Sequence, residues 1–84
     1  MTVQLRDDVV LNETEYGAIL LDQRRGTYWQ LNPTGTMIVK ALLAEGDVET
    51  TARRLVERYD IELDSAREDV RALVAEMRTA GAFR

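Results

Sequence analysis

The stretch over residues 27–35 reads Thr27-Tyr28-Trp29-Gln30-Leu31-Asn32-Pro33-Thr34-Gly35 and changes in character from the first half to the second. Its first half is rich in β-branched and aromatic residues, which is typical of a strand. Its second half is a helix start, because the Asn32 side chain can accept a hydrogen bond from a free backbone N–H and Pro33 loses no useful donor at the first helical position. The stretch therefore predicts a strand over 27–31 that leads directly into a helix.

Two further strands are predicted upstream of this stretch. Residues 9–12 and 16–22 are rich in β-branched and aliphatic side chains, and short polar segments separate them from each other and from 27–31. Both connections are short enough for hairpins, and Gly26 can adopt the positive φ that the end of the second one needs. The first part of the chain is therefore expected to be a three-stranded antiparallel β-meander.

Downstream, apolar residues recur at three- and four-residue spacing, as on one face of a helix. This spacing predicts three α-helices, over 33–45, 48–59 and 65–80. Gly46 is placed to end the first helix in a left-handed cap, and Asp47 to begin the second. The third is predicted to begin at Ser65, which forms a capping box with Glu68, and to end at Gly81. The predicted fold class is α+β.

Length and composition limit what the chain can build. With 84 residues, of which 45% are hydrophobic and 31% charged, it has the size and composition of one globular domain, expected to span 1–84. A domain of this size can hardly spare the apolar contacts that a deep pocket would remove from its core. A surface groove is therefore the expected binding feature.

Charge and hydropathy exclude two classes of partner. The formal net charge is -4, and acidic and basic residues are interspersed along the chain. A nucleic-acid-binding protein normally shows a basic face, so we expect no nucleic acid partner. No apolar stretch approaches the ~18 residues of a membrane span, and the first residues do not form a signal peptide. We therefore expect no membrane contact and a cytoplasmic location.

The residue inventory argues against catalysis. The chain contains neither cysteine nor histidine, so thiolate chemistry, the usual nucleophile-activating base and the commonest metal ligand are all missing. Neighbouring acids such as Asp7 with Asp8, or Glu68 with Asp69, point in different directions and do not make an acid–base pair. We expect no catalytic residues, no metal, no cofactor and no enzymatic activity.

The strand over 27–31 is the candidate binding element. As the last strand of a meander it should have an unpaired edge beside a helix, and it carries neither charge nor proline, which are the usual means of blunting an unused edge. An extended peptide can add to such an edge through main-chain hydrogen bonds. The alternative is a central or covered strand, because one sequence does not reveal strand order.

Side chains on this strand divide between two faces. Trp29 and Leu31 alternate with Tyr28 and Gln30, so that one pair should face the helices and the other should face away. A lone Trp in a small domain usually supplies core area, and core filling explains Trp29 equally well. On the last helix, Leu73 and Met77 lie at the margin of the apolar stripe and can floor a groove beside the strand.

The order of the elements and the stretch 16–22, followed by 26–35, resemble the PqqD-like family. The resemblance covers essentially the whole chain and includes three further points: Gly46-Asp47, Tyr59-Asp60 and Ala80-Gly81. Members of this family are recognition elements for ribosomally made, post-translationally modified peptides (RiPPs). The chain is most similar to the standalone leader-binding proteins of actinobacterial lasso-peptide pathways.

This resemblance implies a winged-helix-like fold in which a leader peptide adds antiparallel to 27–31 and packs toward the last helix. It also implies two partners, a leader-removing cysteine protease and an ATP-dependent lasso cyclase, while the chain itself is not a catalyst. The implied peptide-binding residues are Thr27, Tyr28, Trp29, Gln30, Leu31, Val70, Leu73 and Met77. Arg25, Asp69 and Arg78 are expected at the rim, where they would select charge. A solvated polar face is the simpler explanation of the helix charges.

Two other functions remain open from the sequence. The last two helices can be interpreted as the helix-turn-helix of a winged-helix DNA-binding regulator. A recognition helix presents basic and amide side chains to the groove, whereas the last helix here mixes both signs: Arg67, Arg71 and Arg78 with Glu68, Asp69 and Glu76. The second alternative is a non-catalytic structural subunit of a larger enzyme, which would pair permanently through the same strand edge.

Overall fold

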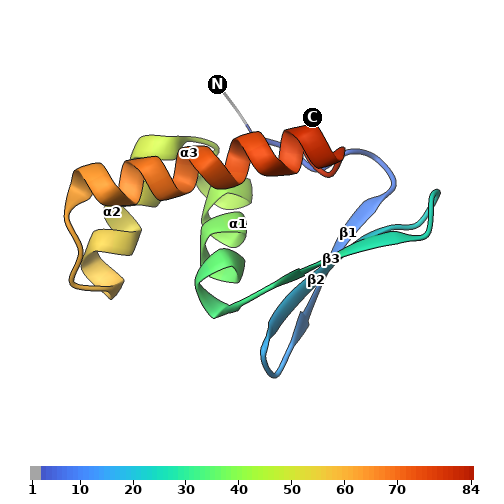
Figure 1. The fold of residues 1–84 in the computed structure, drawn as a ribbon, viewed down its shortest axis with the longest axis horizontal. Helices are drawn as coiled ribbons and strands as arrows, with labels where there is room; N and C mark the ends of the chain where they lie inside the picture. Colours follow the sequence, from blue (N-terminus) through green and yellow to red (C-terminus); the bar gives the residue numbers. More distant parts are fainter. Residues whose placement is uncertain (1–2) are drawn as a thin grey trace.

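The computed structural model describes residues 3–84 and shows three strands followed by three helices (Figure 1). The elements are β1 (Val9–Thr14), β2 (Gly17–Asp22), β3 (Thr27–Leu31), α1 (Pro33–Glu45), α2 (Val48–Arg58) and α3 (Leu63–Ala80). The strands form one antiparallel sheet in the order β1-β2-β3. The predicted meander and the α+β fold class are confirmed.

The helix ends for which the sequence indicated a capping residue form as predicted, with one exception. The side chains of Asn32 and Asp47 each accept the backbone N–H three residues further on, at 2.7 Å, and so cap α1 and α2. Gly46 and Gly81 end α1 and α3 with φ of 82° and 89°. The exception is the start of α3, where the predicted capping box does not form.

Helix α3 begins at Leu63, two residues earlier than predicted. Glu62 occupies the N-cap position without a side-chain cap hydrogen bond, and its carbonyl accepts the N–H of Ala66 at 3.0 Å. Ser65 therefore lies within the first turn, and the capping-box prediction is wrong. The physical reason is that Leu63 packs against the core, so burial of its side chain extends the helix beyond the local polar signal.

The other ends differ from the predictions by one or two residues. β1 continues to Thr14, which pairs with Gly17 across the hairpin, and β2 accordingly starts at Gly17 instead of residue 16. α2 ends at Arg58, because Tyr59 takes an extended conformation with φ of -121° and ψ of 139°. None of these differences moves a strand to another place in the sheet.

Helix α1 joins the sheet to the other helices. It contacts β2 and β3 on one side and α2 on the other, while α3 packs against α2 and runs across the molecule (Figure 1). The core contains fully buried side chains from all of these layers, among them Leu20, Val39, Leu42, Leu55, Val70 and Phe83. None of the helices in the described part of the chain is long and apolar enough to cross a membrane.

The two ends of the chain are tied together next to the sheet. Leu5 and Phe83 form an isolated antiparallel bridge, and the Arg6 N–H donates to the carbonyl of Ala82 at 3.0 Å. Phe83 is fully buried, and its N–H donates to the carbonyl of Met77, so the chain folds back onto the last turn of α3. The end of α3 is thereby held beside the beginning of the sheet.

We predict that Gly17→Ala destabilises the protein more than Gly26→Ala. Both glycines have positive φ, 145° and 72°, so alanine is strained at each by about 1–2 kcal/mol. At Gly17 a Cβ would in addition lie 2.0 Å from the carbonyl oxygen of Leu31, whereas at Gly26 it would meet nothing within 4 Å. Urea unfolding of both variants measures the difference. Equal losses would show that β3 moves freely away from Gly17.

Candidate functional site

Strand β3 lies at an edge of the sheet. Within residues 3–84 it pairs with β2 alone, through the register that runs from Ala18↔Leu31 to Asp22↔Thr27. The predicted edge position of β3 is confirmed, and the alternative of a central strand is wrong. The other edge strand, β1, carries Glu13, which forms an ion pair with Lys40 at 3.1 Å, whereas β3 carries no charge. The two edges are therefore chemically different, and β3 is the one suited to main-chain pairing.

The two faces of β3 also differ, as the alternation predicts. Leu31 is 8% exposed and belongs to the core, and Trp29 is partly buried and packs against the same core. Tyr28, 61% exposed, and Gln30 lie on the opposite face. Trp29 is therefore compatible with both core filling and peptide contact, because its side chain contacts the core and still retains accessible surface.

The end of β3 is held in place by its junction with α1. The Asn32 carbonyl accepts the Thr36 hydroxyl at 2.9 Å, in addition to the cap made by the Asn32 side chain. Beside this junction lies a hollow of about 660 Å³, lined by Thr14, Tyr16, Ala18, Ile19, Gln30, Leu31 and Asn32. The sequence alone does not reveal this hollow, because it forms where residues of β1, β2 and β3 come together.

The three α3 residues that were predicted to bind peptide differ in how much of their surface is exposed. Val70 is fully buried and Met77 is 3% exposed, so both side chains are core and offer almost no surface to a peptide. This corrects the expectation that they line the groove, because the centre of an amphipathic stripe faces the interior. Leu73 is partly buried at the margin of the stripe. It is the predicted α3 side chain with surface remaining for contact.

The predicted rim residues do not form one rim. Asp69 and Arg78 are nine residues apart on α3, and at 3.6 residues per turn this places them on opposite sides of the helix. The Arg78 guanidinium is held at the chain end, where its Nε donates to the Arg84 carbonyl at 3.0 Å. Arg25 is exposed, and a methyl group on Gly81 would lie 3.7 Å from its Nη1. Arg25 therefore lies between the beginning of β3 and the end of α3.

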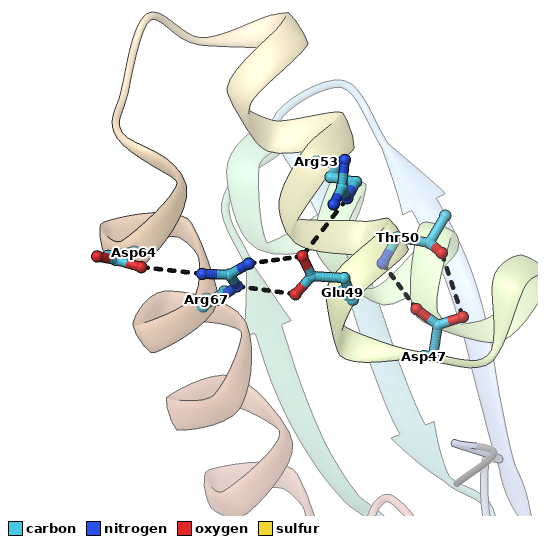
Figure 2. A network of polar contacts seen from close by, with 6 residues as sticks. All are labelled: Asp47, Glu49, Thr50, Arg53, Asp64 and Arg67. Atoms are coloured by element: carbon cyan, nitrogen blue, oxygen red, sulfur yellow. Dashed lines mark hydrogen bonds and ion pairs between the residues drawn. The ribbon is translucent and has the colours of Figure 1, made fainter.

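Helix α3 is fixed against α2 by a polar network centred on Arg67 (Figure 2). Its guanidinium donates to both carboxylate oxygens of Glu49, at 2.8 and 2.7 Å, and to Asp64 at 2.9 Å. Glu49 also forms an ion pair with Arg53 at 3.4 Å. The sequence indicates a polar face for Arg67 but not this partner, because Glu49 lies 18 residues earlier in the chain.

Hydrogen bonding in this network shifts the pKa values of three side chains. The hydrogen bonds from Arg67 hold the pKa of Glu49 below its ordinary value, and the same contact raises the pKa of Arg67. At the start of α2, the backbone N–H of Thr50 lowers the pKa of Asp47. Ionised acids are thus favoured in the folded state at two points of the α2–α3 support.

The described part of the chain also lacks one kind of site. Nowhere in residues 3–84 do three or more His, Cys, Asp or Glu side chains come together in a way that can hold a metal ion. The expectation of a site without metal or cofactor stays a prediction from the sequence.

Comparisons with known proteins give consistent similarities. Residues 17–82 match the family described as coenzyme PQQ synthesis protein D (PqqD). A solved structure described as lasso peptide synthetase B1 complexed with the leader peptide is 36% identical, with a TM-score of 0.94 over 100% of this chain and 99% of that one. TbiB1 in complex with the TbiA(beta) leader peptide is 20% identical, with a TM-score of 0.88 over 96% and 94%, and shows the fold alone. No curated protein sequence matches.

We predict that acid destabilises the protein partly through Glu49. Because its pKa is lower in the folded state, its contribution is complete above the unfolded pKa, about 4.3, and is lost as the pH falls toward the lowered folded value. Glu49→Gln does not titrate there, so its thermal midpoint should fall less between pH 7 and pH 3.5 than that of the parent.

The matched control is Glu57→Gln, an exposed glutamate on the same helix that forms no ion pair within residues 3–84. This control should show the same acid-induced fall as the parent. If Glu49→Gln also falls as far as the parent, the network in Figure 2 does not contribute to the pH dependence.

Proposed function

Because this chain belongs to the PqqD family, we propose that it is a RiPP recognition element that binds the leader segment of a ribosomally made precursor peptide and presents it to processing enzymes. The observation that carries this proposal is the uncharged, unpaired edge of β3, in a fold that matches a lasso peptide synthetase B1 bound to its leader peptide. The leader adds to this edge as a fourth strand. Main-chain hydrogen bonds then supply affinity that is independent of leader sequence.

Specificity in this proposal comes from alternating leader side chains. A strand added beside β3 lies about 4.8 Å away and points successive side chains to opposite faces of the sheet. Those on the helix side meet Trp29 and Leu73, whose remaining surface can accept apolar groups. Those on the other side lie beside Tyr28 and Gln30. An interface of about 1,200 Å² in total gives micromolar to nanomolar binding, depending on how well these contacts are preformed.

The downstream partners in this proposal are enzymes. The bound leader is presented to a leader-removing cysteine protease, and an ATP-dependent lasso cyclase then acts on the remaining core peptide. The chain itself catalyses neither step, in keeping with a sequence that has no cysteine or histidine for nucleophilic chemistry. Its role is to raise the effective concentration of the precursor at the protease.

The polar contacts of α3 favour this function over DNA binding. Arg67, which a recognition helix would need for phosphate or base contacts, is bound to Glu49 and Asp64 instead. Arg78 donates to the Arg84 backbone. Both guanidinium groups are thus already engaged within the protein.

We expect saturable binding, micromolar or tighter, when the purified protein is titrated with the leader peptide of the precursor encoded beside its gene. Fluorescence anisotropy of the labelled leader measures the dissociation constant. A scrambled leader and duplex DNA serve as controls and should not saturate. Binding to DNA alone, weakening with salt, would contradict leader recognition and support a regulator.

We predict that Thr27→Pro and Tyr28→Pro have different effects, one on stability and the other on leader binding. In an antiparallel strand, neighbouring residues direct their N–H groups to opposite edges, so one of Thr27 and Tyr28 donates toward β2 and the other toward the free edge. Proline at the residue that faces β2 should lower the thermal midpoint. Proline at the residue whose N–H points to the free edge should leave the fold intact and weaken leader binding at least about tenfold, or 1.4 kcal/mol. Unchanged leader affinity in both variants would exclude strand addition at this end of β3.

A further inference from the structure

A second hollow, of about 610 Å³, lies at the end of the sheet opposite Asn32. Its walls come from the segment before β1, the turn between β2 and β3, and the chain end after α3. Charged side chains dominate it: Arg6, Arg24, Arg25 and Arg84, with Asp7, Asp8 and Asp22. The proposed function does not yet assign this hollow a role.

Most of the acidic groups in this hollow are already engaged. Asp22 is buried, and its Oδ1 accepts the backbone N–H groups of Arg24 and Arg25 at 3.0 and 3.1 Å, which holds the turn. Asp7 forms an ion pair with Arg84. Within residues 3–84, no ion pair involves the guanidinium groups of Arg6, Arg24 or Arg25. The charged side chains that line the hollow, four arginines and three aspartates, therefore sum to +1 in a protein whose formal net charge is -4.

One wall of the hollow, the turn with Arg24 and Arg25, lies at the end of β3 from which an added antiparallel strand would leave the sheet. Gly26 separates this turn from β3, and the Arg25 guanidinium reaches Gly81 at the end of α3. Every strand pair in the sheet is antiparallel, and antiparallel pairing is the more stable and the more frequent arrangement. A peptide that pairs in this way runs from the Leu31 end of β3 to the Thr27 end. Its next residues toward its own C-terminus then pass beside Arg25.

We propose that this arginine hollow binds acidic side chains of the leader, in the segment immediately C-terminal to the paired strand. The inference rests on the proposed function and adds the chemistry of a second contact. Guanidinium groups match carboxylates in a two-pronged geometry, and the one acid beside Arg24 and Arg25 within the turn, Asp22, uses its Oδ1 to accept two backbone N–H groups and forms no ion pair with either arginine among the described residues. The contact selects among leaders and sets the direction in which the leader lies.

The test uses the shortest leader fragment that binds, defined by truncation, with three added C-terminal residues: Asp-Asp-Asp, Asn-Asn-Asn or Lys-Lys-Lys. We expect the aspartate form to bind about tenfold more tightly than the asparagine form, the effect of two exposed ion pairs, and the lysine form to bind most weakly. The difference should shrink in 1 M salt. The same aspartate triplet at the N-terminus of the fragment should bring no gain.

Two double variants locate the effect. Arg24→Gln with Arg25→Gln should remove the preference for aspartate over asparagine, with the affinity of the unextended fragment for the same variant as the reference. Arg53→Gln with Arg54→Gln, the other basic doublet, lies on α2 outside the hollow and should keep the preference. Thermal unfolding of both proteins confirms that they are folded.

The outcomes separate the two proposals. If the unextended fragment binds and all three extensions bind equally, the arginine hollow is not a leader contact, although leader recognition stands. A gain from the N-terminal triplet, or a preference that persists in the Arg24 and Arg25 variant, also overturns the inference. If no fragment of the leader binds, the proposed function itself fails.

Discussion

At Asn32 the chain passes from β3 into α1, and this junction sets where the sheet ends and where the helices begin. The Asn32 side chain caps α1 at 2.7 Å, and the chain turns from the sheet into the helices without a linker. Gly17 lets the Leu31 carbonyl approach β2 at this point, where any side chain would collide with it. Because the chain leaves the sheet here, no later segment pairs with the outer edge of β3, and that edge remains available.

A domain this small needs most of its apolar side chains for its core, even though one edge of its sheet stays unpaired. The core contains one face of the sheet, the inner side of α1 and the stripe of α3, and these buried residues leave no room for a deep pocket. Recognition is therefore shifted to the periphery, where backbone groups and half-buried side chains such as Trp29 and Leu73 remain accessible. The same groups contribute to the core and to the proposed interface, so stability and binding are coupled at these positions.

Charge is used in two distinct ways on the two sides of the molecule. Around Arg67, opposite charges are paired across α2 and α3, and the pairing fixes the orientation of α3 (Figure 2). Around Arg25, Asp22 accepts backbone N–H groups and Asp7 pairs with Arg84, while the guanidinium groups of Arg24 and Arg25 form no ion pair among the described residues. The paired set is structural, whereas the unpaired set lies where a peptide on β3 would leave the sheet. Residue type alone does not distinguish the two sets.

Local propensity and periodicity were enough to predict the six elements, the caps at Asn32, Asp47, Gly46 and Gly81, and the two faces of β3. Packing between the layers, which no single segment specifies, decided which stripe residues keep exposed surface and buried Val70 and Met77 in the core. It also decided that α3 starts at Leu63, where packing outweighed a local capping signal, and that Arg67 meets Glu49. Such contacts join residues far apart in sequence, and their formation depends on how the layers pack, which no local pattern records.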